Sequence, residues 1–223
     1  MGSVDGVYGV KVTHFPVEEV IRVRFPIDPQ MKISEDLLRE KRDKLQFQLD
    51  VPELAEILSE INPPLNFLVF GLGNDSLFWS ECNKGGRTVF LEDLESWRDK
   101  MAVDHPELET YLIHYETVRS DWRELIDHPK KLQIRDIPED IRGIKWDVIF
   151  VDGPMGYKDS SPGRMKSIYE ASSLIKPGGH VFVHDTGREV EAAYCSRYLL
   201  SRNFVRQVSG FSILNHYCIQ CLN

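Results

Sequence analysis

The sequence predicts an α/β fold in which a mostly parallel sheet carries helices on both faces. Three observations support this prediction. Short apolar runs alternate with helical segments from residue 65 onward. The apolar run 67–70 leads directly into the glycine turn 71–73, and a second apolar run, 88–91, ends in Glu92. Runs this short are typical of strands buried on both faces, and glycines at a strand end allow a sharp turn close to a ligand.

The pattern of the chain divides it into two parts. We expect residues 1–62 to form an amino-terminal helical cap over the ligand cleft, and residues 63–223 to form the main domain. The cap is expected to contain a strand at 19–24, a helix over 34–49 that begins at Ser34, and a short helix from Asp50. The main domain is expected to contain seven strands, at 66–70, 87–91, 110–115, 146–151, 179–184, 204–209 and 213–221, and helices at 75–83, 93–103, 118–127, 163–176 and 187–202.

The composition argues against several classes of function. The 223 residues include 42% hydrophobic residues, and the chain has a mean hydropathy of -0.31 and a net charge of -8. This acidic balance argues against nucleic-acid binding, and no apolar run is long enough to span a membrane. No signal peptide is visible, so we expect a soluble chain. Cys218 and Cys221 lack the second ligand pair of a zinc site, and the cysteines fit a reducing compartment.

The glycine turn and the acid that follows it indicate the class of cofactor. Glu92 comes nineteen residues after Gly73, about the spacing at which a nucleotide-binding sheet places a carboxylate against ribose hydroxyls. Ser76 replaces the third glycine of the dinucleotide fingerprint, and Asp75 precedes it. Asp75 would repel a pyrophosphate but attract the sulfonium and ammonium groups of S-adenosylmethionine. We therefore expect a Rossmann-like, class I methyltransferase sheet with S-adenosylmethionine held by Gly71, Gly73, Asp75, Ser76, Glu92, Tyr115 and Asp152, and with Trp97 near the ribose.

Five sequence motifs follow one another between residues 65 and 191. They are Asn66 to Trp79, Gly85 to Asp93 with Trp97, Trp146 to Tyr157, Pro162 to Met165 with Ile168 and Tyr169, and Val181 to Asp185 with Arg188, Val190 and Glu191. Together they resemble the glucuronoxylan 4-O-methyltransferase family of plant polysaccharide biosynthesis. The resemblance implies a class I methyltransferase that uses S-adenosylmethionine to methylate an oxygen, typically the 4-hydroxyl of glucuronate on xylan.

The chain departs from the pattern of this family in its acceptor loop and at its amino terminus. Asn74 stands where the family has His, Gly153-Pro154-Met155 stands in place of Ala-Pro-Thr, and Ser160-Ser161 in place of an acidic pair. Plant members carry an amino-terminal anchor that holds them in the Golgi, and none is visible here. We therefore expect a cytoplasmic protein, or a Golgi-lumenal one if an anchor has been removed. No oligomeric state is predicted.

Two other functions stay open beside methylation of a saccharide. The first is a soluble O- or N-methyltransferase of a small metabolite, which the altered acceptor loop favours. The second is a catalytically silent protein of polysaccharide assembly. The intact glycine turn, Glu92 and Asp152 argue against the silent protein.

Three side chains at the ends of two neighbouring strands are candidates for catalysis. Asp152 follows the strand 146–151, and His184 and Asp185 end the next strand. An acceptor hydroxyl must lose its proton during in-line displacement at the sulfonium carbon, and each of the three could accept it. Asp152 and Asp185 also resemble the carboxylates of metal-dependent catechol-type methyltransferases, so Mg²⁺, or Mn²⁺ or Co²⁺ with His184, is a further expectation. The structural alternatives are a turn cap for Asp152 and a buried, hydrogen-bonded His184.

Four residues near the same strand ends are candidates for binding the acceptor, whether this is a saccharide or a small molecule. Tyr157 can stack on a sugar ring, and Arg164 can bind a substrate carboxylate through two parallel hydrogen bonds. The alternative for Arg164 is an intramolecular salt bridge. The remaining two are Lys158 and Arg188.

Overall fold

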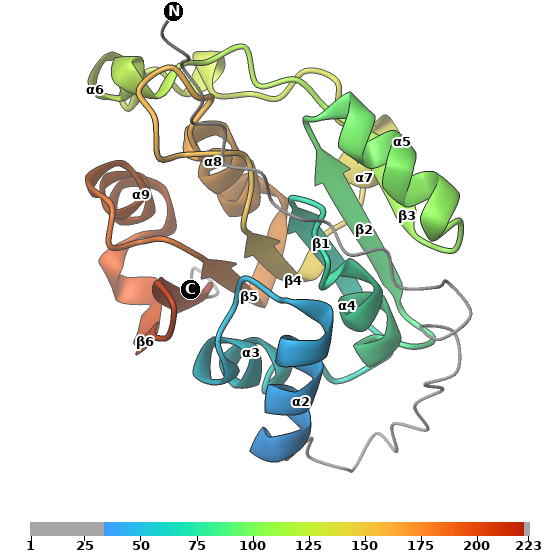
Figure 1. Ribbon diagram of the computed structural model, residues 1–223. Helices are drawn as coiled ribbons and strands as arrows, with labels where there is room; N and C mark the ends of the chain where they lie inside the picture. The colour runs from blue at the N-terminus through green and yellow to red at the C-terminus, as the bar shows by residue number, and fades with distance from the viewer. Residues whose placement is uncertain (1–33, 221–223) are drawn as a thin grey trace, which may run out of the picture.

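A seven-stranded sheet forms the centre of the protein in the computed structural model, which describes residues 34–220 (Figure 1). The strands are β1 (Asn66–Phe70), β2 (Arg87–Glu92), β3 (Glu109–Leu112), β4 (Trp146–Val151), β5 (Ile175–Val183), β6 (Phe204–Ser209) and β7 (Ile213–Cys218). Their order is β3-β2-β1-β4-β5-β7-β6. The first five strands run parallel, and β7 lies antiparallel between β5 and β6. This arrangement confirms the predicted sheet and its antiparallel closing pair.

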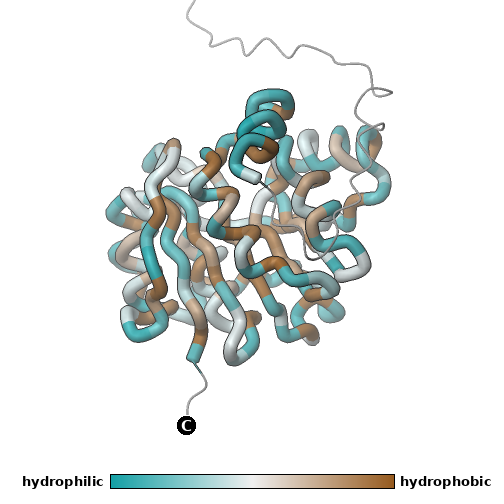
Figure 2. Tube along the Cα trace, turned by 90° about the horizontal axis from the view of Figure 1, so that it is seen from below, coloured by the Kyte–Doolittle hydropathy of each residue, from teal (hydrophilic) through white to brown (hydrophobic). Residues whose placement is uncertain are grey.

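Helices cover both faces of this sheet, as predicted. One face carries α2 (Glu35–Leu45), α3 (Val51–Leu58), α4 (Ser76–Cys82) and α5 (Glu95–Asp104), and the other carries α6 (Trp122–Leu125), α7 (Glu139–Arg142), α8 (Met165–Leu174) and α9 (Glu189–Tyr194). Strand β1 shows why its apolar run is continuous: Leu68 and Phe70 belong to one buried cluster, whereas Phe67 and Val69 belong to the other. Apolar residues accordingly follow the inner strands in Figure 2, and hydrophilic ones predominate on the outer turns.

The described part of the predicted cap packs directly on the sheet. The Ser34 side chain accepts a hydrogen bond from Leu37 N at 3.3 Å and so begins α2. Asp50 begins α3 and forms a reciprocal capping box with Glu53. Both helices bury apolar side chains in the same cluster as β1. The domain boundary after residue 62 stays a prediction, and the predicted strand at 19–24 lies outside the described residues.

The structure corrects the predicted elements in several places. α2 ends at Leu45 rather than at residue 49, β3 ends at Leu112 rather than at residue 115, and β7 ends at Cys218 rather than at residue 221. β5 begins four residues earlier than predicted, because Ile175 already pairs with Trp146 before a bulge. The predicted helix 187–202 is α-helical only in α9 and continues as a π-helical turn, Cys195–Leu199. The predicted helix 118–127 is reduced to α6 and a preceding 3₁₀ turn, and the backbone N–H groups of Arg119 and Ser120 donate to the 159–161 loop. Within residues 34–220, the helices lack the combination of length and apolar character that crossing a bilayer requires.

Candidate active site

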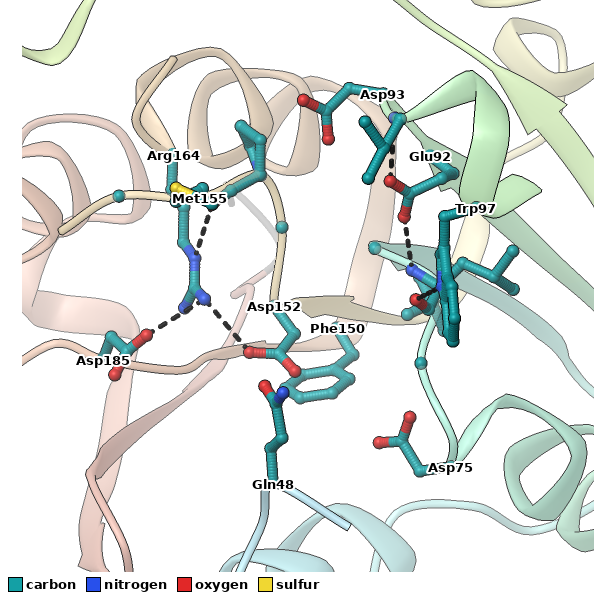
Figure 3. A pocket seen from close by; sticks show the side chains of 18 of the residues that line it. Gln48, Asp75, Glu92, Asp93, Trp97, Phe150, Asp152, Met155, Arg164 and Asp185 are labelled. Carbon is teal, nitrogen blue, oxygen red and sulfur yellow. Dashed lines mark hydrogen bonds and ion pairs between the residues drawn. The ribbon is translucent and has the colours of Figure 1, made fainter. Parts of the chain in front are cut away.

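A cavity of about 500 Å³ opens at the carboxyl ends of β1, β2 and β4 (Figure 3). This is where open α/β sheets bind their ligands. Its lining includes Val69 and Phe150 from the strands, and also Gln46 and Gln48 from the segment between α2 and α3. The two glutamines were not predicted, because isolated polar residues in a loop far from the glycine turn carry no recognisable pattern.

The turn after β1 brings the backbone close to the end of β4. Gly71 has a φ of +114°, and a Cβ at this position would lie 3.2 Å from Gly153 N. Only glycine adopts this conformation without strain. Gly71 N donates to Leu91 O at 2.8 Å, and Gly73 N donates to Ser76 Oγ at 2.9 Å. Gly71 and Gly73 line the cavity, whereas Ser76 is buried beneath the turn and holds its shape.

Glu92 projects from the end of β2 into the wall of the cavity. Its Oε2 accepts a hydrogen bond from Leu72 N and its Oε1 accepts one from Leu94 N, both at 2.9 Å. Burial raises the pKa of Glu92 to about 6. Trp97 lines the same wall, because its Nε1 donates to Leu72 O at 2.6 Å. Each carboxylate oxygen of Glu92 keeps a second acceptor position, so a ribose diol can still bind there.

Asp75 faces the cavity from the start of α4, opposite Asp152 (Figure 3). Its Oδ2 accepts a hydrogen bond from Trp79 Nε1 at 2.9 Å. Burial, helped by the negative charge of Asp152, raises the pKa of Asp75 to about 6. A cationic ligand between these two carboxylates would therefore relieve both their desolvation and their repulsion.

Arg164 occupies the middle of the predicted catalytic group. Its Nη2 lies 3.2 Å from Asp152 Oδ1 and 3.0 Å from Asp185 Oδ2. Its Nε donates to Pro154 O at 3.2 Å, and its Nη1 donates to His184 O at 2.8 Å. The Arg164 side chain is 7% exposed, although it reaches the cavity wall. Arg164 therefore forms the intramolecular salt bridges given above as its alternative, and its guanidinium is not available as a clamp for a substrate carboxylate.

His184 lies between two carboxylates that come from distant parts of the chain. Its Nδ1 is 2.9 Å from Asp152 Oδ1, and its Nε2 is 3.1 Å from Glu53 Oε1. Burial lowers the pKa of His184, but the hydrogen bonds to Asp152 and Glu53 outweigh it and raise this pKa to about 9. The resulting imidazolium has no lone pair at neutral pH, so His184 is not a general base in this arrangement. Glu53 is fully buried in α3 and was not predicted, because 131 positions separate it from His184.

The predicted metal site does not fit the groups that surround it. Asp152, His184 and Asp185 each offer a ligand atom within 4.8 Å of the others. However, the Arg164 guanidinium lies on both carboxylates, and His184 is itself a cation. Burial raises the pKa of Asp185, yet the charges of Arg164 and His184 lower it overall. A divalent ion would have to displace or face two positive charges, so these residues do not support the predicted metal.

Three of the other predicted binding residues lie at or beside the rim of the cavity, and Tyr115 lies in the core. Tyr157 is 60% exposed and lines the cavity rim, together with Arg188, whose Nη2 lies 2.9 Å from Asp185 Oδ2. Lys158 is exposed beside the rim, with its Nζ 5.4 Å from the centre of the Tyr157 ring. Tyr115 is buried in the core and does not line the cavity. Its hydroxyl accepts from Ser167 Oγ at 2.9 Å, so Tyr115 is held inside the core.

The fold and the acidic, glycine-lined cavity define the class of protein. A TehB-like S-adenosylmethionine-dependent methyltransferase from Corynebacterium glutamicum has the same fold, with a TM-score of 0.51 and 15% sequence identity over 84% of this chain and 97% of that one. At this level of identity the likeness concerns the fold alone. It confirms the predicted fold class, that of the class I S-adenosylmethionine-dependent methyltransferases.

The family follows from closer relatives. The model of the family IRX15/IRX15L/GXM matches residues 49–133 and 127–217, and the chain belongs to this family. From Arabidopsis thaliana, Glucuronoxylan 4-O-methyltransferase 2 is 38% identical over 77% of this chain, Protein IRX15-LIKE 34% over 77%, and Arabinogalactan O-methyltransferase 1 36% over 74%. The matched region spans 67%, 61% and 66% of these relatives. The predicted family and the predicted methyltransferase class are confirmed.

Proposed function

We propose that this chain transfers a methyl group from S-adenosylmethionine to a hydroxyl of a saccharide, with glucuronate of a xylan-type polysaccharide as the first candidate acceptor. The observation that carries the proposal is the charge of the cavity. Five carboxylates line it, against two guanidinium groups. Such a lining favours a cationic donor and disfavours a nucleotide phosphate. The carboxylates belong to Asp75, Glu92, Asp93, Asp152 and Asp185.

Each part of the donor has a matching feature in the cavity. The glycine turn allows close approach of the cofactor backbone, and Glu92 accepts hydrogen bonds from the ribose hydroxyls. Trp97, fixed by its bond to Leu72 O, offers an aromatic wall on the same side. Asp75 and Asp152 attract the ammonium and sulfonium groups at the opposite end of the cavity.

The rim of the cavity suits an acidic sugar. Arg188 is 31% exposed and remains within reach of a ligand, although it already pairs with Asp185. A uronate carboxylate can accept from the remaining guanidinium donors. Tyr157 can pack on the face of a sugar ring, and Gln46 and Gln48 can hydrogen-bond to hydroxyls. These contacts support a saccharide acceptor and, more specifically, a uronic acid.

Methyl transfer to a hydroxyl requires alignment of the two reacting groups, exclusion of water and one group that accepts a proton. His184 and Arg164 both contact Asp152 through Oδ1. Oδ2 of Asp152 is therefore the atom we assign to accept the proton of the acceptor hydroxyl. In this assignment, His184 and Arg164 position Asp152 and stabilise its charge, and neither reacts itself.

A small metabolite is the second candidate acceptor. Met155 is 50% exposed and lines the cavity in the loop that departs from the family pattern. A flexible apolar side chain at this position favours a less polar ligand than a polysaccharide. A panel that contains glucuronoxylan oligomers, arabinogalactan, phenols and amines separates the two candidates by the product that is methylated.

The first experiment measures binding of S-adenosylhomocysteine by calorimetry and turnover on this panel. We expect Asp152→Asn to abolish turnover and to retain measurable binding of S-adenosylhomocysteine, because Asp75 still attracts its ammonium group. Asp159→Asn is the matched control, because Asp159 lies in the adjacent loop and is 79% exposed in its pair with Arg119. Absence of binding heat in the wild-type protein would favour the silent assembly protein, and full turnover of Asp152→Asn would remove the assigned role.

A further inference from the structure

Three carboxylates of the α3 segment face three histidines on the face of the sheet that α3 covers, at β5 and β7. One of these carboxylate–histidine pairs, Glu53 with His184, belongs to the candidate active site. The other two lie further toward the amino end of β5, and none of their residues lines the cavity. His216 pairs with Phe182, two residues before His184, and His180 lies four residues before His184, about 13 Å away at the usual rise of a strand. The three pairs are Glu53–His184, Glu56–His216 and Glu60–His180.

The two histidines of this second group contact each other. His180 Nδ1 lies 2.8 Å from His216 Nε2. His216 pairs with Phe182 across β5 and β7, so both imidazoles project from the face that α3 covers. The Phe182 ring stacks on His216 at 4.3 Å and closes the inner side of the group. Glu60 Oε2 approaches His180 Nε2 at 3.4 Å from the outer side.

A second carboxylate orients His216. Glu56 Oε1 lies 2.7 Å from His216 Nδ1 and is itself 3.3 Å from Arg206 Nε. The Glu56 carboxylate accepts from His216 Nδ1 and so leaves His216 Nε2 facing His180. A histidine held in this way by a carboxylate is typical of metal ligands in proteins.

We propose that Glu60, His180 and His216 form a structural binding site for a divalent ion of the Zn²⁺ type, independent of methyl transfer. One ligand atom from each residue lies within 4.8 Å of the other two. Bonds of about 2.0–2.1 Å place two ligands of a tetrahedral ion about 3.3 Å apart, close to the 3.4 Å between Glu60 Oε2 and His180 Nε2. Two imidazoles and one carboxylate suit Zn²⁺ and disfavour Mg²⁺, which prefers oxygen ligands.

The surroundings of the three residues also suit an ion. The side chains of His180 and Glu60 are 24% and 29% exposed, which gives an entry path and room for a water as the fourth ligand. The 2.8 Å contact between the imidazoles involves His180 Nδ1, whereas Glu60 faces His180 Nε2. Binding therefore requires a rotation of the His180 ring that turns one of its nitrogens toward the ion shared with Glu60 and His216. Once bound, the ion joins the end of α3 to β5 and β7 and so holds the segment that carries Glu53 and Gln48 against the sheet.

The test uses the full chain, stripped with EDTA and titrated with zinc chloride by calorimetry and by thermal unfolding. His180→Gln and Glu60→Gln remove single ligands from half-exposed positions, where folding is least affected. His114→Gln is the matched control, because His114 also contacts a carboxylate, Asp136, at 2.6 Å, but no second histidine. Far-UV circular dichroism without zinc checks that each variant folds. The visible spectrum with Co²⁺ reports the coordination of the wild-type protein without any substitution.

The wild-type chain is expected to bind one Zn²⁺ per molecule and to unfold about 5–10 °C higher at a free zinc concentration a hundred times the Kd. His180→Gln and Glu60→Gln are expected to weaken binding at least tenfold, and His114→Gln to leave it unchanged. The alternative is that protons alone satisfy the four groups, as a hydrogen-bonded chain from Glu60 through the two histidines to Glu56. Absence of one-to-one binding, equal affinity in His180→Gln, or a Co²⁺ spectrum without nitrogen ligands would overturn the proposal.

Discussion

Replacement of Glu53 by glutamine gives the sharpest test of the charge assigned to His184. Glu53 Oε1 lies 3.1 Å from His184 Nε2, while its Oε2 accepts from Asp50 N at 2.7 Å and from Phe211 N at 3.3 Å. In Glu53→Gln, the single amide oxygen must face the two backbone donors. The amide NH₂ group then faces His184 Nε2 and requires a lone pair there. The substitution should therefore make His184 neutral.

The magnitude follows from the pKa of His184. A value of about 9 in the folded protein, against 6.5 in the unfolded chain, stabilises the fold by about 3 kcal/mol below pH 6.5. Because this pKa is raised on folding, the contribution is lost as the pH rises through 9. Between pH 7 and pH 9 the loss is about 2 kcal/mol. Since Glu53→Gln leaves His184 neutral over this range, its free energy of unfolding should lack that loss.

The measurement is urea unfolding of both proteins at pH 7, 8 and 9. Glu56→Gln is the matched control: it removes the same charge one turn further along α3, but its partner His216 has a lowered pKa and does not titrate in this range. The three proteins share their other titratable groups, so the comparison cancels the effect of those groups. Equal pH dependence in wild type and Glu53→Gln, or an equal change in Glu56→Gln, would refute the charged His184.

Three further predictions concern the cofactor cavity. Glu92→Gln should weaken binding of S-adenosylhomocysteine roughly 10- to 100-fold in calorimetry, because a hydrogen bond to a charged group contributes about 1.5–3 kcal/mol; unchanged affinity would place the ribose elsewhere. Gly71→Ala should destabilise the fold by about 1–3 kcal/mol in urea unfolding and weaken cofactor binding, because φ is +114° and Gly153 N is close. Gly85→Ala, with a φ of +89° but open space around its Cβ, should destabilise the fold without affecting the cofactor. The preference for S-adenosylmethionine over S-adenosylhomocysteine should fall as the pH drops from 7 to 5. Asp75, with a pKa of about 6, becomes protonated over this range, and only the methyl donor carries a sulfonium that its charge can attract. In Asp75→Asn the preference should not depend on pH.

The parts of the fold that could be predicted from sequence are those with a local pattern. The run 67–70 is buried on both faces and lies in the centre of the sheet, and the glycine turn after it needs the positive φ of Gly71. Asp152 and His184 come together because parallel neighbouring strands end at the same edge of the sheet. The short helix α7 was not predicted, because four residues are too few to show a helical period.

The parts of the site that could not be predicted depend on contacts between distant segments. Arg164 follows a glycine in a polar loop, and the sequence does not show whether its partners are a ligand or the protein. The structure places two carboxylates on it. Glu53 has a clear local role as the capping-box residue of α3. Because that role already explains a glutamate at this position, the sequence gives no sign of its second role beside His184.

The cap helices belong to the site rather than merely covering it. Leu54 and Ile57 of α3 are fully buried, in the cluster that also contains Phe67 and Phe182 of the sheet. Removing residues before the predicted boundary would therefore expose an apolar sheet face and leave the Nε2 of His184 without its carboxylate. The same helix that completes the hydrophobic core also supplies the charge that holds His184, and through it Asp152, in place. The packing of α3 on the sheet and the position of the proposed proton acceptor thus depend on the same helix.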